Sequence, residues 1–546
     1  MSNRRYTAEL AARRLEELRN EDTDSDVDED TDCEETNDIE SDISSESDDS
    51  DSSVSNSPSD GGFVSISRDG TEWHRHPLRH SSTKSPPQNI LRHAGGPTRY
   101  ILQRSDDITD IFLELLDRRN IDDIVEFTKA EATRSGKPNF NLDSVEFIAF
   151  IGLCLARGVA KGRNEPLSSF WSDDTGRPMF RETMSRNRFK DIMRFLRFDN
   201  KDLRKSRRQE DRFCLIRTVW NRVMNNSGKA YRPHECVTVD EQLLSCKARC
   251  SFIQYLPSKP GKFGIKFWLC CDSATYYVLD GFPYVGKEDG RVEVGLGEHV
   301  ALKLTKDFEG VNVTTDNFFT SQALAGKLLK EKKTLVGTLR FNRKEIPAEL
   351  KDECKAATKH TSSFRFSETT TIVGYKAKAN KEVFLLSSLH LDGHVVDSEK
   401  KVPEIIEFYN KTKIGVDKAD EMIKFYSSKT GSRRWPLHVF YNIIDICALN
   451  AFIIAADTKL YVSSRRDFLF AISRQLCREH GNRRQRPYLS LQLSEVSNFL
   501  GKENDLTRRT TCKRCHKNKT KQACISCGLY ACGSCSKQIC VSCLSK

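Results

Sequence analysis

The chain has 546 residues, with 87 Lys and Arg against 77 Asp and Glu, so it is long enough for several domains and carries a net charge of +10. Residues 21–60 hold 18 acidic residues and no Lys or Arg, which leaves a net charge of +28 on the rest of the chain. A surplus of that size indicates a polyanionic partner such as nucleic acid, with a merely soluble basic surface as the alternative. We expect no secretory signal, because the first 30 residues are charged and lack an apolar run.

Residues 1–96 are predicted to be disordered. The acidic stretch and the polar linker that follows it are too poor in apolar side chains to offset the entropy of the chain. Residues 97–235 are predicted to be helical, because apolar residues recur at helical spacing in 108–116, 121–130, 144–156 and 180–198.

The helix expected over residues 180–198 has an apolar face, and basic residues crowd its remaining surface. Another basic run, residues 201–217, follows. A solvated cationic face is the alternative for any single helix, but several basic helices in a row favour contact with phosphate. The candidate contacts in this region are Arg186, Arg188 and Lys190.

Beyond residue 235 the apolar period changes from 3.6 to 2, which predicts strands. Strands are expected at 236–240, at 311–316 and at 334–340, with a hairpin at 264–272 and 275–285 and a helix at 321–330. This order indicates a mixed sheet flanked by helices, an α/β fold. Residues 343–403 interrupt the pattern and are predicted to be a β-rich insertion.

From residue 403 to about 474 the chain is predicted to be helical again, followed by a polar, basic linker that contains residues 481–487. The apolar stretch around 440–456 is interpreted as a buried helix and not a membrane span, because Asn442, Asp445 and Asn450 within it are costly to place in lipid.

Three aspartates are candidates for catalysis. Asp240 and Asp316 are the last residues of expected strands, and Asp417 lies at the start of an expected helix. Carboxylates at strand ends and at a helix start can converge at one edge of a sheet, and hard oxygen donors suit Mg²⁺ or Mn²⁺. Two such ions roughly 3.5–4 Å apart are suited to phosphodiester transfer. Each aspartate alone could instead serve in a turn or as a helix cap. The sequence separations between the three aspartates, 76 and 101 residues, are too wide to be specific for a catalytic triad.

Eight of the 19 cysteines lie within residues 512–543 and form four CxxC pairs. A CxxC turn presents two thiolates to one tetrahedral Zn²⁺, so eight thiolates predict two zinc ions. Cross-braced and sequential pairings are both compatible with the spacing. The predicted ligands are Cys512, Cys515, Cys524, Cys527, Cys532, Cys535, Cys540 and Cys543.

The segments VDEQLL (239–244), TTDNFFTS (314–321) and GVDKADEM (415–422) resemble the three acidic motifs of piggyBac transposases, in the same order. FRETMSRNRFKDIMRFLRFDN (180–200), LPSKPGKFGIK (256–266) and RRWPLHVFYNI (433–443) are supporting matches. The resemblance covers roughly residues 100–543. Phe318 stands where many members of the family have Trp, an aromatic replacement.

The resemblance implies an RNase H-like catalytic core in two parts, residues 236–342 and 404–426, separated by an insertion domain at 343–403. It implies helical dimerisation and DNA-binding segments at 97–235 and 427–505, and a cross-braced zinc finger at 506–546. The catalytic, Mg²⁺-binding residues would be Asp240, Asp316 and Asp417, with Asp420 as an accessory acid or as a residue of the helix surface. Further DNA contacts would be Arg434, Trp435 (stacked on a base or simply packed), Lys513 and Arg514.

The implied activity is cut-and-paste transposition: nicking at the transposon ends, hairpin formation and joining at TTAA sites. The expected partners are the terminal inverted repeats, the target DNA and a second copy of the chain in a homodimer. We expect a nuclear protein, with residues 483–486 as a weak candidate signal. The alternatives are a domesticated relative that binds DNA without cutting it, and a RING-type ubiquitin ligase or chromatin reader.

Overall fold

The computed structural model describes residues 64–78, 91, 93–257, 259–286 and 295–500, together with residues 510, 511, 517, 519 and 520. The first helical region begins near residue 99, and aspartates cap several of its helices. Asp143, for example, accepts a hydrogen bond from the backbone N–H of Glu146 at 2.8 Å. The longer helices of this region are α3 (Ile108–Leu116), α4 (Arg118–Arg134), α5 (Ser144–Val159), α6 (Pro178–Thr183), α7 (Arg186–Phe195), α8 (Arg204–Glu210) and α9 (Arg217–Ala230).

Residues 180–198 form two helices and not the single one expected. Helix α6 ends at Thr183, Met184 takes an extended conformation, and Ser185 caps α7 by accepting a hydrogen bond from the backbone N–H of Arg188 at 3.2 Å. The break buries Met184, which is 1% exposed. The apolar face predicted for this segment is present on α7, where Phe189 and Ile192 are fully buried.

The central part of the sheet has the strand order β8-β7-β5-β9-β10. Strands β5, β9 and β10 run parallel to one another, and β7 is antiparallel to both β5 and β8. The predicted hairpin of β7 and β8 is confirmed, as is the mixed α/β class. The elements are β5 (Cys236–Ser245), β7 (Phe263–Asp272), β8 (Val278–Pro283), α10 (Leu296–Thr305), β9 (Asn312–Thr315), α11 (Gln322–Lys330) and β10 (Thr334–Leu339).

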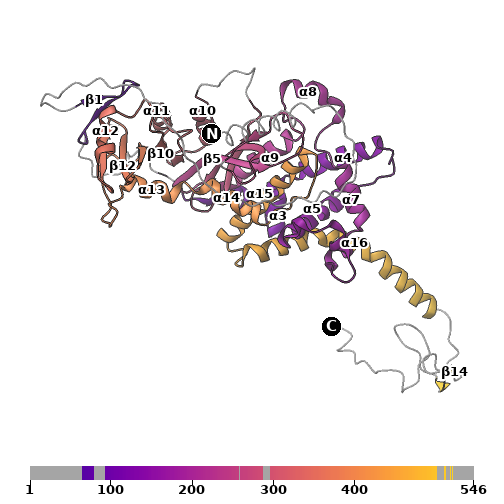
Figure 1. Cartoon of the computed structure of the whole chain (residues 1–546). Helices are drawn as coiled ribbons and strands as arrows, with labels where there is room; N and C mark the ends of the chain where they lie inside the picture. Colours follow the sequence, from indigo (N-terminus) through magenta and orange to yellow (C-terminus); the bar gives the residue numbers. More distant parts are fainter. Residues whose placement is uncertain are drawn as a thin grey trace.

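The segment 343–403 continues this sheet. It contains α12 (Ala348–Ala356), β11 (Ser362–Phe366), β12 (Thr371–Lys378) and β13 (Lys381–Ser387), and β13 pairs antiparallel with β10. The result is one sheet of eleven strands among the described residues. Figure 1 shows β12 and α12 at one end of the molecule, α4, α5 and α7 at the other, and β5 between them.

The expectation that residues 1–96 are disordered is wrong for residues 64–78. Strands β1 (Val64–Ile66) and β2 (Glu72–His74) form a hairpin whose His74 pairs with Phe366 of β11. The Trp73 side chain is fully buried, and its Nε1 donates a hydrogen bond to Ser67 Oγ at 3.0 Å. The hairpin is ordered because it adds to an edge of the sheet that is distant in sequence.

The second helical region contains α13 (Glu404–Thr412), α14 (Gly415–Phe425), α15 (Trp435–Asp457) and α16 (Arg465–Leu500). Among the described residues, α15 is the one helix long and apolar enough to cross a membrane, and 89% of its apolar stretch is buried inside the protein. This agrees with the predicted core helix. The linker expected around residues 481–487 is instead part of α16, which is continuous to Leu500.

Replacing Trp73 with Ala should destabilise the protein by about 3–5 kcal/mol, because the change removes a large buried side chain and leaves a cavity. Chemical denaturation of the full chain measures the effect. Leu78→Ala in the same segment is the control, since Leu78 is 51% exposed. Equal unfolding midpoints for the two variants would show that the hairpin does not contribute to stability.

Candidate active site

Asp240 and Asp316 lie next to each other because of the register of two strands. The parallel strands β5 and β9 pair Val239 with Thr315, and each aspartate is the next residue of its chain segment. The Asp316 carboxylate accepts a hydrogen bond from the backbone N–H of Phe318 at 2.9 Å, which fixes the start of the following loop. Both aspartates therefore lie where the parallel pairing of β5 with β9 ends. The strand expected to end at Asp240 instead continues to Ser245 beside β7.

Burial raises the pKa of Asp240 well above its usual value, and the neighbouring carboxylates of Glu241 and Asp316 raise it further. Burial also raises the pKa of Asp316. Burial and neighbouring negative charge both destabilise the ionised form of a carboxylate. A cation placed among these carboxylates would stabilise their ionised forms. The pair is thus electrostatically suited to bind positive charge.

Asp417 is brought to the same edge by the first turn of α14. Gly415 lies so close to β5 that a Cβ atom there would come within 2.5 Å of Thr238 Oγ1, so only glycine permits this approach. Unlike the two strand aspartates, Asp417 has a side chain that is 64% exposed.

Three buried threonines fasten the helical connection to the two strands. Thr238 Oγ1 donates a hydrogen bond to the carbonyl oxygen of Thr412 at 2.6 Å, and Thr314 Oγ1 donates one to Thr412 Oγ1 at 2.8 Å. Thr238 and Thr314 each lie two residues before a site aspartate, and Thr412 ends α13, just before α14. The three side chains are between 0% and 8% exposed. This threonine cluster determines where Asp417 lies relative to Asp240 and Asp316.

Asp420 links α14 to β5 and α15. Its Oδ1 accepts a hydrogen bond from Gln242 Nε2 at 2.9 Å, and its Oδ2 pairs with Lys424 Nζ at 2.6 Å. Gln242 Oε1 in turn accepts a hydrogen bond from Asn442 Nδ2 at 2.8 Å. Both oxygens of Asp420 are therefore engaged within the protein, which favours a positioning role over a direct contribution to the site.

Two lysines face the acidic cluster, and the sequence analysis assigned neither of them a role. Lys259 Nζ lies 3.3 Å from Asp417 Oδ1, and Lys266 Nζ lies 3.9 Å from Glu241 Oε2. Although burial opposes its charge, the carboxylates of Asp240, Asp417 and Glu241 raise the pKa of Lys259 above its usual value. The signal was present in the segment LPSKPGKFGIK (256–266), which contains both lysines.

Aromatic and basic residues complete the surroundings of the site. The Phe318 ring stacks on Trp268 with a centroid separation of 5.3 Å, and Lys266 Nζ lies 3.8 Å from the centroid of the Trp268 ring. Beside Asp316, Arg340 Nε donates a hydrogen bond to Asn317 Oδ1 at 2.9 Å. Positive side chains thus flank the carboxylates on several sides.

The carboxylate oxygens fit Mg²⁺ or Mn²⁺ in their chemistry but are not gathered around one ion. Among the residues that the structure describes, no three His, Cys, Asp or Glu side chains are grouped closely enough to hold a metal. Asp240 and Asp316 are neighbours, whereas Asp417 is paired with Lys259. The closed cradle of three aspartates expected from the sequence is not formed in this arrangement.

Comparison with known proteins gives the family. A protein-family model described as Transposase IS4 matches residues 107–452, which include all three aspartates. The human PiggyBac transposable element-derived protein 3 is 26% identical over 469 residues, covering 80% of this chain and 75% of the relative. The chain belongs to the piggyBac family of transposases.

Two further similarities support the piggyBac assignment. The human PiggyBac transposable element-derived protein 2 is 22% identical over 437 residues, covering 74% of this chain and 72% of the relative. A cryo-EM structure of a piggyBac transposase synaptic complex with hairpin DNA is similar with a TM-score of 0.68 and 31% identity, covering 81% of this chain and 100% of the solved one.

Three of the residues predicted to contact DNA make contacts within the protein. Both oxygens of Glu146 accept hydrogen bonds from Arg188, at 2.6 and 2.7 Å. Arg434 donates hydrogen bonds to the carbonyl oxygens of Met193 and Leu196 at the end of α7. Trp435 is 5% exposed and packs against Phe213 and Phe252. These side chains hold the protein together; Arg186 and Lys190 are exposed on α7, and Lys513 and Arg514 lie outside the described residues.

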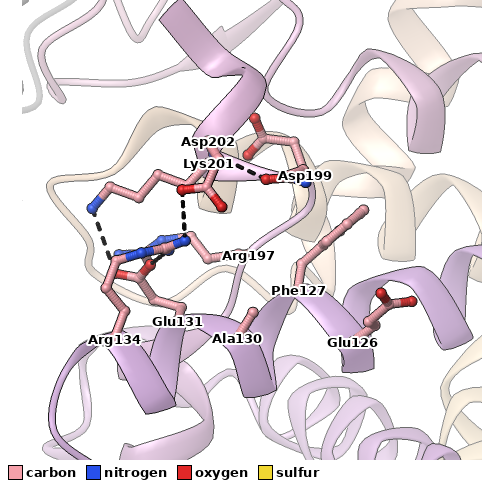
Figure 2. Close-up of a pocket in the computed structure, with 10 residues that line it drawn as sticks. Glu126, Phe127, Ala130, Glu131, Arg134, Arg197, Asp199, Lys201 and Asp202 are labelled. Atoms are coloured by element: carbon pink, nitrogen blue, oxygen red, sulfur yellow. Dashed lines mark hydrogen bonds and ion pairs between the residues drawn. The ribbon is translucent and has the colours of Figure 1, made fainter.

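Part of the basic run at 201–217 is also used internally. Figure 2 shows a charged hollow between α4 and the segment 197–202, where Arg134 reaches both Glu131 and Asp202, at 2.7 and 3.0 Å. Glu131 also pairs with the buried Arg197 at 3.0 Å and with Lys201 of the basic run at 3.6 Å. The opposite charges around this hollow compensate one another, so it does not offer a net cationic surface to DNA.

The predicted zinc ligands Cys512, Cys515, Cys524, Cys527, Cys532, Cys535, Cys540 and Cys543 lie outside the described residues. All ten cysteines in the described ranges are free thiols, and nine of these are buried.

Thr412→Val should destabilise the protein by about 1–3 kcal/mol, because it leaves the buried hydroxyl of Thr314 without its acceptor. Thr133→Val is the matched control: Thr133 and Thr412 each donate to the carbonyl oxygen four residues earlier, but Thr133 is exposed and has no contact to a strand. The control should change stability by less than about 0.5 kcal/mol. Denaturant unfolding compares the two, and similar losses would show that the threonine cluster adds nothing beyond local helix contacts.

Proposed function

We propose that the protein is a cut-and-paste DNA transposase that nicks transposon ends, forms hairpin intermediates and joins the ends at TTAA targets in a metal-dependent reaction. The observation that carries the proposal is the side-by-side placement of Asp240 and Asp316 where the parallel pairing of β5 and β9 ends, with Asp417 of α14 held nearby. Membership of the piggyBac family and similarity to a transposase synaptic complex support it.

The catalytic core in this proposal is RNase H-like. The order β8-β7-β5-β9-β10, with three parallel strands and an antiparallel hairpin at one edge, supports the assignment. The segment 343–403 is then an insertion that extends the sheet beyond β10, before the third aspartate is reached.

Asp240, Asp316 and Asp417 would hold Mg²⁺ or Mn²⁺, two ions per site, once Asp417 turns toward the strand aspartates. The bound ions would supply Lewis-acid stabilisation of the attacking and leaving oxygens. The contribution of the protein is to position the phosphate and to offset its charge, and Lys266, Arg340 and Arg343 lie around the edge where a phosphate would enter.

The remaining assignments extend the proposal. Action on two DNA ends calls for a homodimer, and a DNA substrate calls for location in the nucleus. The eight C-terminal cysteines are proposed to bind two Zn²⁺ ions in a cross-braced module that contacts the terminal repeats, with Lys513 and Arg514 among its basic residues.

The alternative is a piggyBac-derived protein that binds DNA without transposing it. The names of the human relatives, which describe them as derived from a transposable element, keep this alternative in view. The three aspartates at one sheet edge favour the enzyme, because DNA binding alone does not require buried carboxylates that repel phosphate.

Asp240→Asn, Asp316→Asn and Asp417→Asn should each lower cleavage of DNA carrying the cognate terminal repeats by roughly 10²–10⁴-fold, since each removes a carboxylate needed to stabilise several kcal/mol of transition-state charge. Binding of the same DNA should be unchanged or tighter. Gel analysis of nicked and hairpin products, with binding measured in parallel, tests this.

Asp397→Asn is the control for charge removal, because Asp397 is an exposed residue of the segment 343–403. It should cleave at the wild-type rate. Wild-type protein that binds the repeats but produces no nick would establish the DNA-binding alternative, and an active Asp240→Asn variant would refute the assignment of the site.

A further inference from the structure

Lys259 occupies a special position in the acidic site. Its Nζ lies 3.3 Å from Asp417 Oδ1 and donates a hydrogen bond to the backbone carbonyl oxygen of Glu241 at 3.4 Å. Its positive charge also interacts with the Asp240 carboxylate. One ammonium group thus lies among carboxylates that repel one another.

The loop that carries Lys259 is held firmly against β5. Leu256 donates its backbone N–H to the carbonyl oxygen of Lys262 at 2.7 Å, and Lys262 donates to that of Lys259 at 3.0 Å. Gly261 lies so close to Ser245 that a Cβ atom there would overlap Ser245 Oγ, at 1.9 Å. The lysine is 21% exposed and residues beside it are joined by backbone hydrogen bonds, so this contact differs from an ordinary ion pair between two mobile surface side chains.

The partner of the lysine is the movable member of the triad. Asp240 and Asp316 are constrained by strand pairing and by hydrogen bonds from the following backbone N–H groups. Asp417 is 64% exposed, and its carboxylate pairs with Lys259. A change of side-chain rotamer at Asp417 would therefore move its carboxylate without disturbing the strand pairing that holds Asp240 and Asp316.

We propose that Lys259 is a resident counter-cation that holds Asp417 in the metal-free protein and gives it up when a divalent cation gathers the three aspartates. The inference rests on the proposed function, because it takes Asp240, Asp316 and Asp417 as the metal ligands. It accounts for the pairing of Asp417 with Lys259 while Asp240 and Asp316 lie on neighbouring strands.

The exchange predicts competition between an ammonium group and a divalent cation for the same carboxylate. Lys259 stabilises the metal-free state by pairing with Asp417, and it repels a cation that enters beside it. Removing its charge should therefore strengthen metal binding. If Lys259 instead holds Asp417 in place for the metal, removing it should weaken metal binding, so the direction of the change separates the two roles.

The test is titration of the full-length protein, purified without chelators, with MnCl₂ alone, measuring free Mn²⁺ by electron paramagnetic resonance. Lys259→Met should bind Mn²⁺ about 3- to 10-fold more tightly than wild type, and Lys259→Arg should remain within about twofold of it. Addition of Mn²⁺ should also raise the thermal unfolding midpoint of Lys259→Met by more than that of wild type.

Lys262→Met is the matched control, because Lys262 lies in the same loop with the same charge but is exposed. It should bind Mn²⁺ like wild type. In an Asp417→Asn background, Lys259→Met should no longer tighten binding, since the carboxylate for which the two cations compete is absent.

Unchanged or weaker Mn²⁺ binding by Lys259→Met overturns the inference. If wild type binds Mn²⁺ and Asp240→Asn weakens that binding, the metal centre of the proposed function stands even when the Lys259 inference fails. Absence of Mn²⁺ binding to wild type at millimolar concentration overturns both.

Discussion

The geometry of the site depends on buried hydrogen bonds among Thr238, Thr314 and Thr412. They join two parallel strands to the end of α13, and α14 begins three residues later. A hydroxyl group buried without a partner is costly, so this network strongly favours one placement of the helix on the sheet. Small threonine side chains and Gly415 also let the helix approach closely enough for Asp417 to share an edge with the strand aspartates.

That close approach creates an electrostatic problem. Asp240, Asp316 and Glu241 are close enough for their charges to repel, and burial removes the water that would screen them. Lys259 and Lys266 offset part of this repulsion in the protein alone. The two lysines allow the site to fold but do not neutralise it completely. The remaining negative charge favours binding of a divalent cation.

Some basic side chains of this protein form contacts within the fold, and others remain exposed to a polyanionic partner. Arg188, Arg197 and Arg434 form hydrogen bonds and ion pairs that join helices to each other or to the loops that follow them. Guanidinium groups suit this task, because they satisfy carboxylates and helix-end carbonyl groups with several donors at once. Net charge therefore indicates a polyanionic partner, but it does not identify the side chains that touch it.

Local sequence was enough to place most elements of the core, because strand period, turns and helix caps depend on neighbours within a few residues: the start of β5, the β7–β8 hairpin, β9 and α11 lie where expected. The strand expected to end at Asp240 instead continues to Ser245, because residues 240–245 pair with the distant strand β7. The motif order then led to the family. Contacts between distant residues were beyond such reasoning. The hydrogen bonds of Thr412 span 98 and 174 residues, Lys259 and Asp417 are 158 apart, and Trp73 is ordered by a sheet edge almost 300 residues away. Whether a basic residue faces DNA or a buried glutamate, and whether three aspartates surround a metal or a lysine, depends on which remote segments fold against each other.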